Sequence, residues 1–261
     1  MVLSFEKYQA AGNDFVVLDN REGNYSSIPS DQLRFLCDRH KGVGADGVIF
    51  INAHPTADFE MIYFNSDGNK STLCGNGGRC AVAFAFQKNI ISTVTTFMAS
   101  DGIHHAEWLG EGQVRLQMQN VKEIQHKEKA IITNTGSPHY ITLAADLATL
   151  DVKNEGAAIR YSPPFKKEGI NVNFLEHIKD SHFRIRTYER GVEDETLACG
   201  TGAVASALAI DQWGNYPKSE QIHLEARGGN LLVDFKKDNT GYHSIFLQGP
   251  ATFVFSGTLT L

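Results

Sequence analysis

Two cysteines, each followed by Gly-x-Gly, are the residues with the clearest chemical potential in this chain. Cys74 opens Cys-Gly-Asn-Gly and Cys199 opens Cys-Gly-Thr-Gly, and each motif leads into a run of small and apolar residues. Close to half of the 261-residue chain separates the two cysteines. This spacing predicts two similar halves, and we expect their thiols to face one substrate carbon from opposite sides.

The residues after each cysteine predict a helix that is apolar around its whole circumference and therefore buried on all sides. Gly77 and Gly202 fall in the first turn of these helices, where the backbone needs room for a close approach. A cysteine at a helix N-terminus lies beside unpaired N–H groups and the positive end of the helix dipole. That setting lowers a thiol pKa from about 8.5 toward neutrality, and the same N–H groups can hold a carboxylate.

Two opposed thiols can invert the α-carbon of an amino acid without a cofactor. One thiolate removes the α-proton while the other thiol donates a proton to the opposite face, with each sulfur roughly 3–3.5 Å from the carbon. Backbone N–H groups would meet the developing negative charge. Pyridoxal phosphate is the usual alternative, and no local motif signals it. A purely structural cysteine pair and a redox dithiol are the competing interpretations, although redox pairs normally use Cys-x-x-Cys spacing.

The composition is that of an ordinary soluble protein, with 42% hydrophobic residues and a net charge of −6. There is no basic footprint for nucleic acid, no apolar run of membrane-spanning length and no secretory signal pattern at the N-terminus. No closely spaced Cys/His pairs predict zinc, and Cys37 and Cys80 are expected to be small buried hydrophobes. We therefore expect a cytoplasmic protein with no metal, no nucleic-acid partner and no membrane contact.

The order of elements predicts an α/β (α+β) fold of two pseudo-symmetric domains, 1–119 and 120–251, with a final strand at 252–261 that packs back onto the first. We expect each domain to be a curled, mainly antiparallel sheet around one buried helix, with the active site in the cleft between them. Residues 1–20 predict a hairpin. A helix is expected from an N-cap at Ser30 to about Arg39, and short helices are expected around 145–150 and 155–160.

Two tempting motifs are rejected on their context. Residues 42–47 match the dinucleotide fingerprint G-x-G-x-x-G, which requires a strand before it and a helix after it. Here the predicted helix precedes the motif and the strand 48–51 follows it, so a glycine-rich helix-to-strand connection is predicted. His104 and His105 are adjacent in a predicted strand, so their side chains point to opposite faces and do not form a metal pair.

Several motifs in a fixed order make the chain resemble the diaminopimelate epimerase family along nearly its whole length. They are Gly12 to Phe15, His40 to Gly47, Phe64 to Gly68, Leu73 to Cys80, Thr135 to His139, Gly169 to Val172, and Tyr188 to Gly191 leading to Ala198 to Gly202. The resemblance implies a cofactor-independent homodimer that interconverts LL- and meso-diaminopimelate for lysine and peptidoglycan synthesis. It also implies that Cys199 removes the proton from the LL isomer and that Cys74 donates one.

The resemblance also implies a set of substrate-binding residues. They are Gly75, Asn76, Gly200 and Thr201 for the carboxylate at the reacting carbon, and Asn13, Asn65, Asn171, Glu189 and Arg190 for the remaining ammonium and carboxylate groups. Arginine can grip a carboxylate with two hydrogen bonds, and glutamate can accept from an ammonium. His139 is expected near the site, behind the residues that touch substrate, with a structural role as the alternative.

Some positions depart from the family pattern. Gly47 and Ser137 stand where some members carry Gln and Asn, and the segment 192–195 is one residue longer than in some relatives. These changes affect the expected substrate geometry and leave the two thiols intact. A racemase of histidine, proline or hydroxyproline on the same scaffold is one alternative. A catalytically silent amino-acid-binding protein and a redox thiol protein are the others.

Overall fold

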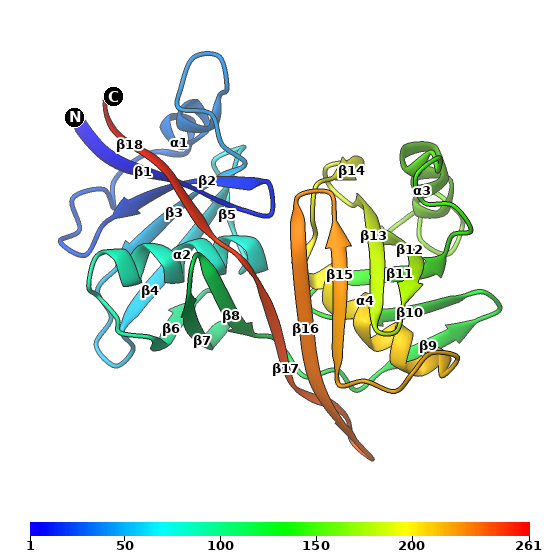
Figure 1. Ribbon diagram of the computed structural model, residues 1–261. Coiled ribbons are helices and arrows are strands. Elements are labelled where there is room, and N and C mark those ends of the chain that lie inside the picture. Colours follow the sequence, from blue (N-terminus) through cyan, green and yellow to red (C-terminus); the bar gives the residue numbers. More distant parts are fainter. The chain divides into compact units, whose positions relative to one another are not determined.

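The computed structural model describes residues 1–261, which form four helices and eighteen strands in two compact units. Unit 1 comprises residues 1–116 and 249–261, and unit 2 comprises residues 117–248. No helix is both long enough and apolar enough to cross a membrane. The mixed α/β class predicted from the sequence is confirmed, and in each unit strands surround one long helix, α2 in unit 1 and α4 in unit 2 (Figure 1).

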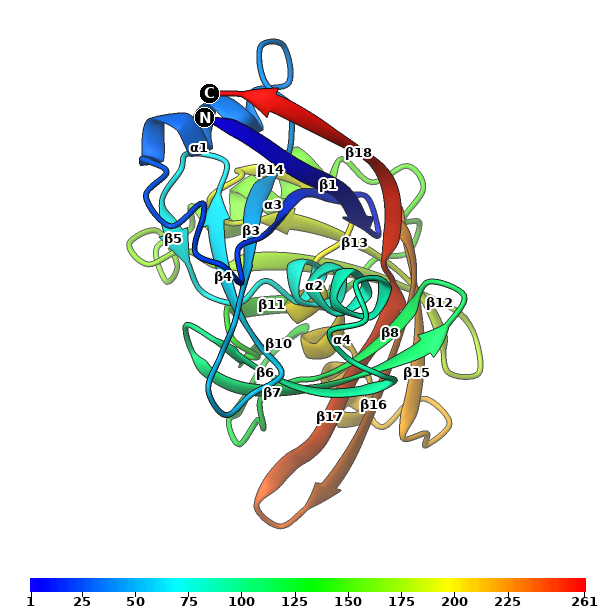
Figure 2. The same ribbon diagram turned by 90° about the vertical axis from the view of Figure 1, so that its left-hand side faces the viewer.

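Unit 1 is built on strands that run around α2 (Gly75–Gln87), as Figure 2 shows nearly end-on. Its other elements are β1 (Val2–Ala10), β2 (Asn13–Asp19), α1 (Ser30–Cys37), β3 (Gly47–Asn52), β4 (Phe59–Asn65), β5 (Lys70–Ser71), β6 (Val94–Ala99), β7 (Gly102–Gly110), β8 (Gln113–Gln117) and β18 (Thr252–Thr260). Most pairings are antiparallel, including β1 with β2 and β1 with β18. Parallel pairing joins β2 to β3 and β4 to β6.

Unit 2 repeats this arrangement around α4 (Gly200–Trp213). It contains β9 (Ile124–Lys127), β10 (Ala130–Asn134), β11 (Pro138–Leu143), α3 (Val152–Arg160), β12 (Asn171–Lys179), β13 (His182–Glu189), β14 (Asp194–Thr196), β15 (Gln221–Ala226), β16 (Gly229–Asp238) and most of β17 (Gly241–Pro250). Parallel pairs join β11 to β12 and β13 to β15. The remaining ladders between these strands are antiparallel.

The two central helices are buried as their composition predicts. Every residue from Gly75 to Ala85 is buried in α2, and α4 is buried from Gly202 to Ile210. A helix surrounded by strands has no solvent face, so small residues dominate both sequences. The first turn of each helix, where the cysteines lie, is therefore fixed by packing on all sides.

The glycine-rich connection predicted at residues 42–47 is confirmed, with α1 before it and β3 after it. The N-cap predicted at Ser30 is wrong. Pro29, with extended backbone, precedes the helix, Ser30 is already helical, and no side chain caps this end.

The short helix predicted at 145–150 is also wrong. Asp146 accepts hydrogen bonds from the N–H groups of Ala148 and Thr149 and from the Thr149 hydroxyl, which closes a turn instead. The second predicted helix belongs to α3, which begins earlier because Asp151 caps it through the Asn154 N–H.

Candidate active site

Cys74 and Cys199 are the N-cap residues of the two central helices. Both have extended backbone conformations, both are half-buried, and neither forms a disulfide. The Cys74 carbonyl accepts the first helical bond from Gly78, and the Cys199 carbonyl accepts the corresponding bond from Ala203. The three N–H groups that follow each cysteine therefore precede the first helical hydrogen bond and lie at the positive end of the helix dipole. The sequence expectation of one thiol at each buried helix start is confirmed.

In unit 1, two side-chain amides connect Cys74 to a buried arginine. The Cys74 Sγ lies 3.7 Å from Asn13 Oδ1, and Asn76 Nδ2 donates to the same oxygen at 3.3 Å. Arg79 Nη2 donates to Asn76 Oδ1 at 2.8 Å, and the Arg79 side chain is fully buried in α2. Burial lowers the pKa of the Arg79 guanidinium to about 10, so it remains cationic at neutral pH. We call these four residues the Cys74 cluster.

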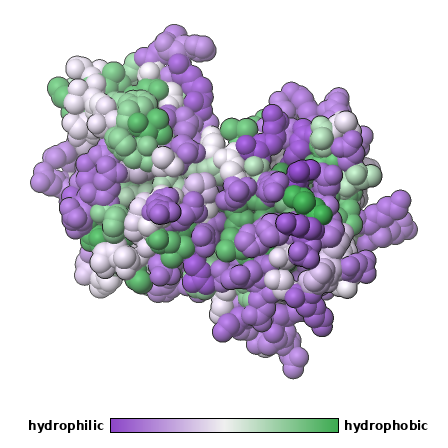
Figure 3. Space-filling model, viewed as in Figure 1, coloured by the Kyte–Doolittle hydropathy of each residue, from purple (hydrophilic) through white to green (hydrophobic).

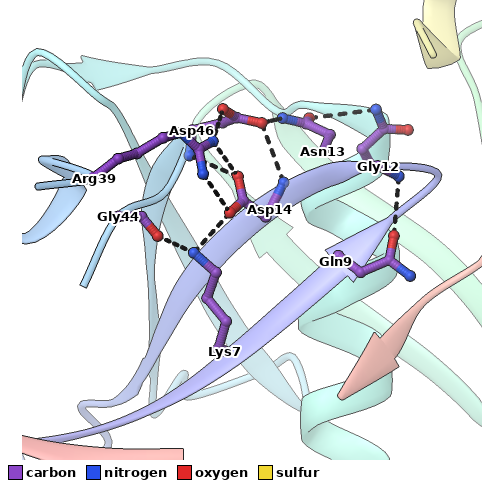
Figure 4. A network of polar contacts seen from close by, with 9 residues as sticks. Lys7, Gln9, Gly12, Asn13, Asp14, Arg39, Gly44 and Asp46 are labelled. Carbon is purple, nitrogen blue, oxygen red and sulfur yellow. Dashed lines mark hydrogen bonds and ion pairs between the residues drawn. The ribbon is translucent and has the colours of Figure 1, made fainter. Parts of the chain in front are cut away.

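The other side of Asn13 is held by an ion-pair network at the start of β2 (Figure 4). Asn13 Nδ2 donates to Asp46 Oδ2 at 2.5 Å, and Asp46 Oδ1 lies 2.7 Å from Arg39 Nη2. The same guanidinium binds Asp14, which also pairs with the buried Lys7 at 2.7 Å. Burial alone would raise the pKa of the Asp14 carboxyl, but its hydrogen bonds with Arg39 and Lys7 lower it to about 2.

In unit 2, a chain of polar side chains leads from the sheet to Cys199. Thr187 Oγ1 donates to Asn173 Oδ1 at 3.0 Å, and Asn173 Nδ2 lies 3.0 Å from His139 Nδ1. His139 Nε2 lies 2.9 Å from Thr201 Oγ1, which in turn lies 3.5 Å from Cys199 Sγ. These five residues form the Cys199 cluster.

His139 is neutral in this cluster. Burial, helped by the positive charge of Arg190, lowers the pKa of the imidazole to about 3. A neutral imidazole has one donor and one acceptor nitrogen, so its two partners must have opposite roles. His139 therefore transmits hydrogen-bond direction without carrying charge.

Asn171 and Arg190 are joined at the adjacent ends of β12 and β13. The Arg190 N–H donates to Asn171 Oδ1 at 2.8 Å, and Asn171 Nδ2 donates to Ser137 Oγ at 2.8 Å. Ser137 thus fixes the Asn171 amide. The Arg190 side chain donates to the Glu168 carbonyl at 2.9 Å. Glu189 ends β13 and Asn65 ends β4.

Gly47 lies where no side chain fits. A Cβ at this position would lie 2.5 Å from the Phe64 carbonyl oxygen and 2.5 Å from the Tyr63 ring. Gly47, which follows Asp46 in the sequence, pairs with Asn65 between the antiparallel strands β3 and β4. The Tyr63 ring therefore takes the space beside this residue pair.

Four residues of the two clusters and the adjoining ion-pair network had no role in the sequence-based prediction: Asp46, Arg79, Asn173 and Thr187. A sequence signal existed for two of them. Asn173 follows Asn171 by two positions in an apolar strand, so both amides lie on one face. Arg79 is a lone cation in an otherwise uncharged buried helix. Buried polar groups of this kind require partners, and that requirement points to a structured polar site.

The sequence as a whole matches known proteins. The family model described as "Diaminopimelate epimerase" matches residues 5–124 and 131–254. A protein named diaminopimelate epimerase from Flavobacterium psychrophilum is 49% identical over 253 residues, which cover 97% of this chain and 98% of that protein. A second, from Chlorobaculum tepidum, is 44% identical and covers 96% of this chain and 99% of that protein.

Solved structures share the fold at much lower sequence identity. A phenazine biosynthesis protein of the PhzF family from Bacillus anthracis superposes with a TM-score of 0.77 over the whole of both chains, at 14% identity. A hydroxyproline epimerase from Agrobacterium vitis superposes with a TM-score of 0.70, also at 14% identity, over 99% of this chain and 92% of that one. Likeness at this level shows a common fold alone.

Proposed function

This chain belongs to the diaminopimelate epimerase family, and from that premise we propose that it interconverts LL- and meso-2,6-diaminopimelate without a cofactor, using Cys74 and Cys199 as the acid/base pair. The observation that carries the proposal is the equivalent position of the two thiols. Each caps the N-terminus of a buried central helix. That position activates a thiol and supplies N–H groups for a carboxylate.

In the direction from LL to meso, the Cys199 thiolate takes the α-proton and the C–H electron pair remains on the substrate. The Cys74 thiol donates its proton to the opposite face, so configuration inverts and the enzyme is left with a Cys199 thiol and a Cys74 thiolate. The reverse reaction uses the same groups in exchanged roles. Concerted or closely coupled transfers of this kind need both sulfurs within roughly 3–3.5 Å of the carbon.

The remaining roles follow the residue chemistry. The backbone N–H groups of Gly75, Asn76, Gly200 and Thr201 hold the carboxylate at the reacting carbon and offset the charge that develops there. Asn13, Asn65, Asn171, Glu189 and Arg190 bind the other ammonium and carboxylate groups. His139 stays behind this layer, which agrees with its full burial.

We place the enzyme in the cytoplasm, in lysine and peptidoglycan precursor synthesis, as a homodimer. Apolar side chains on β18 support self-association. Phe253, Val254 and Phe255 are 39%, 50% and 44% exposed, and hydrophobic surface gathers along this strand in unit 1 (Figure 3). Phe253 lies beside Tyr8 and Phe255 beside Phe5, so β18 exposes apolar surface on both of its faces, and exposed apolar surface favours a protein–protein contact. Sedimentation velocity should give about twice the 28.8 kDa chain mass, and a monomer at micromolar concentration would contradict the dimer.

The racemases of other amino acids are weaker candidates. The likeness to the hydroxyproline epimerase rests on 14% identity, whereas the diaminopimelate epimerase relatives match at up to 49% over nearly the whole chain. No separate observation favours a silent binding protein or a redox protein.

The test is proton NMR in D2O with LL-diaminopimelate, following loss of the α-proton and appearance of the meso isomer. Wild type should do both, and Cys74→Ala and Cys199→Ala should each lose epimerisation. Histidine and proline serve as parallel substrates under full reduction. If only histidine or proline exchanges its α-proton, the two-thiol mechanism stands with a different substrate. If none of the three amino acids exchanges, the proposed enzymatic activity is refuted.

A further inference from the structure

We propose that two hydrogen-bond chains of opposite direction set different resting states for the two sulfurs, with Cys74 held as a thiol and Cys199 held as a thiolate. This inference deepens the proposed two-thiol function and rests on it. It assigns positioning roles to Arg79 and Asp46 in one unit and to Asn173 in the other. Arg79 and Asp46 act through the amides of Asn76 and Asn13, of which Asn13 contacts Cys74. Asn173 acts through His139 on Thr201, whose hydroxyl contacts Cys199.

The direction of the chain at Cys74 is fixed at both ends by charge. Arg79 can only donate, so it turns the Asn76 oxygen toward itself and leaves Asn76 Nδ2 to donate to Asn13 Oδ1. The Asp46 carboxylate can only accept, so it binds Asn13 Nδ2 and holds that amide in the same orientation. Two independent neighbours thus agree on one orientation of Asn13.

The atom presented to Cys74 is therefore an oxygen. The Sγ–Oδ1 separation of 3.7 Å can carry a hydrogen bond only if the sulfur keeps its proton. A thiolate there would face the lone pairs of Asn13 Oδ1. Hydrogen bonding to the neutral form of an acid favours that form, so the cluster favours a protonated Cys74.

The direction of the chain at Cys199 is fixed by a backbone carbonyl, and the Thr187 hydroxyl follows it. Asn173 Nδ2 also lies 3.3 Å from the Tyr140 carbonyl oxygen, which can only accept. On its other side, Asn173 Oδ1 accepts from the Thr187 hydroxyl. The amide is therefore oriented with its Nδ2 toward His139 Nδ1, and that nitrogen must accept.

The neutral imidazole then carries its proton on Nε2 and donates to Thr201 Oγ1. Because Thr201 Oγ1 accepts this hydrogen bond from His139, its own hydroxyl proton can be donated to the Cys199 sulfur at 3.5 Å. Every bond from Thr187 onward runs toward the sulfur. A hydrogen bond donated to a charged acceptor stabilises the charged form, so this cluster favours a Cys199 thiolate.

The two chains give the resting enzyme a preferred direction. A Cys199 thiolate and a Cys74 thiol are the protonation states that the LL isomer needs. One turnover leaves a Cys199 thiol and a Cys74 thiolate, which the two clusters disfavour. Exchange of one proton at each sulfur with solvent or with a following substrate restores the resting state.

The chains can be tested without substrate by measuring the reactivity of each cysteine separately. The full-length protein is pulsed with iodoacetamide at a series of pH values between 5 and 9, digested, and quantified at each cysteine by mass spectrometry. The wild type should show half-maximal alkylation of Cys199 at lower pH than that of Cys74. Cys37 and Cys80 are buried and should stay unreacted in a folded sample. Equal pH profiles for Cys74 and Cys199 would overturn the inference.

Two variants should move the two cysteines in opposite directions. Thr201→Val removes the donor and should shift the Cys199 profile up by about one pH unit, as expected for loss of one hydrogen bond to a charged acceptor. Thr201→Ser restores the hydroxyl and should restore the profile. Asn13→Ala removes the acceptor and should shift the Cys74 profile down by a similar amount. In each variant the other cysteine is the internal control, and a common shift of both would refute separate chains.

A second readout addresses the imidazole directly. In 15N NMR spectra, the signals lost in His139→Gln identify His139, which should be neutral at pH 7 with its proton on Nε2. A proton on Nδ1, or an imidazolium, would overturn the chain at Cys199. None of these measurements uses diaminopimelate, so a negative result in the epimerisation assay leaves the thiol asymmetry standing, and equal thiols in an active epimerase would remove only this inference.

Discussion

The orientation of each side-chain amide near the two cysteines is decided by a neighbour with a single hydrogen-bonding role. Arg79 and Asp46 have this effect on Asn76 and Asn13, and the Tyr140 carbonyl has it on Asn173. A buried guanidinium without a carboxylate partner is costly. Its cost is offset here by bonds to Asn76 Oδ1 and to the carbonyls of Gly75 and Pro250. The charged residues near Cys74 thus determine the direction of the hydrogen bonds that lead to its sulfur.

One prediction at this scale concerns stability in acid. The pKa of Asp14 is lowered to about 2, so the carboxylate contributes stability above the unfolded-state pKa near 4 and loses it as pH falls from about 4 to 2. The contribution is about 2 kcal/mol at neutral pH. Asp14→Asn should therefore be less stable than wild type at pH 6, with a difference that narrows toward pH 2.5.

Urea unfolding at pH 6, 4 and 3 would measure this difference. Asp19→Asn is the matched control, because Asp19 pairs with Arg21 at the exposed end of the same strand, where its pKa is lowered mainly by that side-chain hydrogen bond. An exposed ion pair contributes little. A constant difference between Asp14→Asn and wild type at all three pH values would contradict the assignment.

At the scale of elements, each half of the chain offers the same device, a buried helix whose first turn meets the sheet closely enough to require glycine. The requirement differs in kind between the helices. A Cβ on Gly202 would lie 2.4 Å from Asn173 Oδ1, whereas a Cβ on Gly77 would meet the ends of Met61 and Ile49 at 3.3 and 3.4 Å. The absence of a side chain at Gly202 thus lets Asn173 of the Cys199 cluster pack directly against the first turn of α4.

Gly202→Ala should displace Asn173 and lower kcat/KM at least about tenfold, with a loss of stability of about 1–3 kcal/mol from overpacking. Gly77→Ala should lower both kcat/KM and stability by less, because the flexible ends of the neighbouring side chains can shift. Alanine also favours the helix by about 1 kcal/mol relative to glycine. Steady-state epimerisation and thermal unfolding of the pair would measure this. Equal losses in the two variants would show that the Asn173 contact has no special importance.

The turn before the Cys199 motif is also held by side chains. Glu193 has a positive φ of 56° and accepts hydrogen bonds from the hydroxyls of Tyr161 and Tyr188 at 2.9 Å. Burial and these contacts raise the pKa of Tyr188. Glu193 is therefore held by the tyrosine that follows α3 and by a tyrosine of β13, next to the β13–β14 pairing.

At the scale of the whole molecule, unit 1 is made from both ends of the chain. β18 pairs with β1 from Val2 to Gln9, and the Met1 ammonium donates to the Leu261 carbonyl at 2.8 Å (Figure 2). Aromatic contacts join the strands, with Phe5 on Phe255 and Tyr8 on Phe253. Unit 1 is therefore complete only after the last residues of the chain are in place.

Removal of residues 252–261 should destabilise unit 1 selectively. β1 loses a partner strand along nearly its whole length, and its amides should exchange with solvent at least about a hundredfold faster. Hydrogen exchange followed by mass spectrometry would measure this, with the β12 and β13 peptides of unit 2 as the internal reference. Unchanged protection of β1 would show that β18 adds no stability.

The sequence by itself determined the features that depend on local pattern. These are the mixed α/β class, the two buried helices behind Cys-Gly-x-Gly, the glycine-rich connection at 42–47 and the family. Apolar periodicity and glycine spacing encode them directly. The sequence-based predictions of a cap at Ser30 and a helix at 145–150 were wrong. The extended backbone of Pro29 decided the first, and the hydrogen bonds of the Asp146 side chain decided the second.

Only the tertiary structure decided the hydrogen-bond partners of the thiols. Asp46 and Asn13, or Asn173 and Thr187, are distant in sequence and meet because sheet register brings them together. Register and side-chain direction depend on the whole set of strands packed around each helix. For that reason the cysteines could be found from the sequence, while the hydrogen bonds that distinguish Cys74 from Cys199 could not.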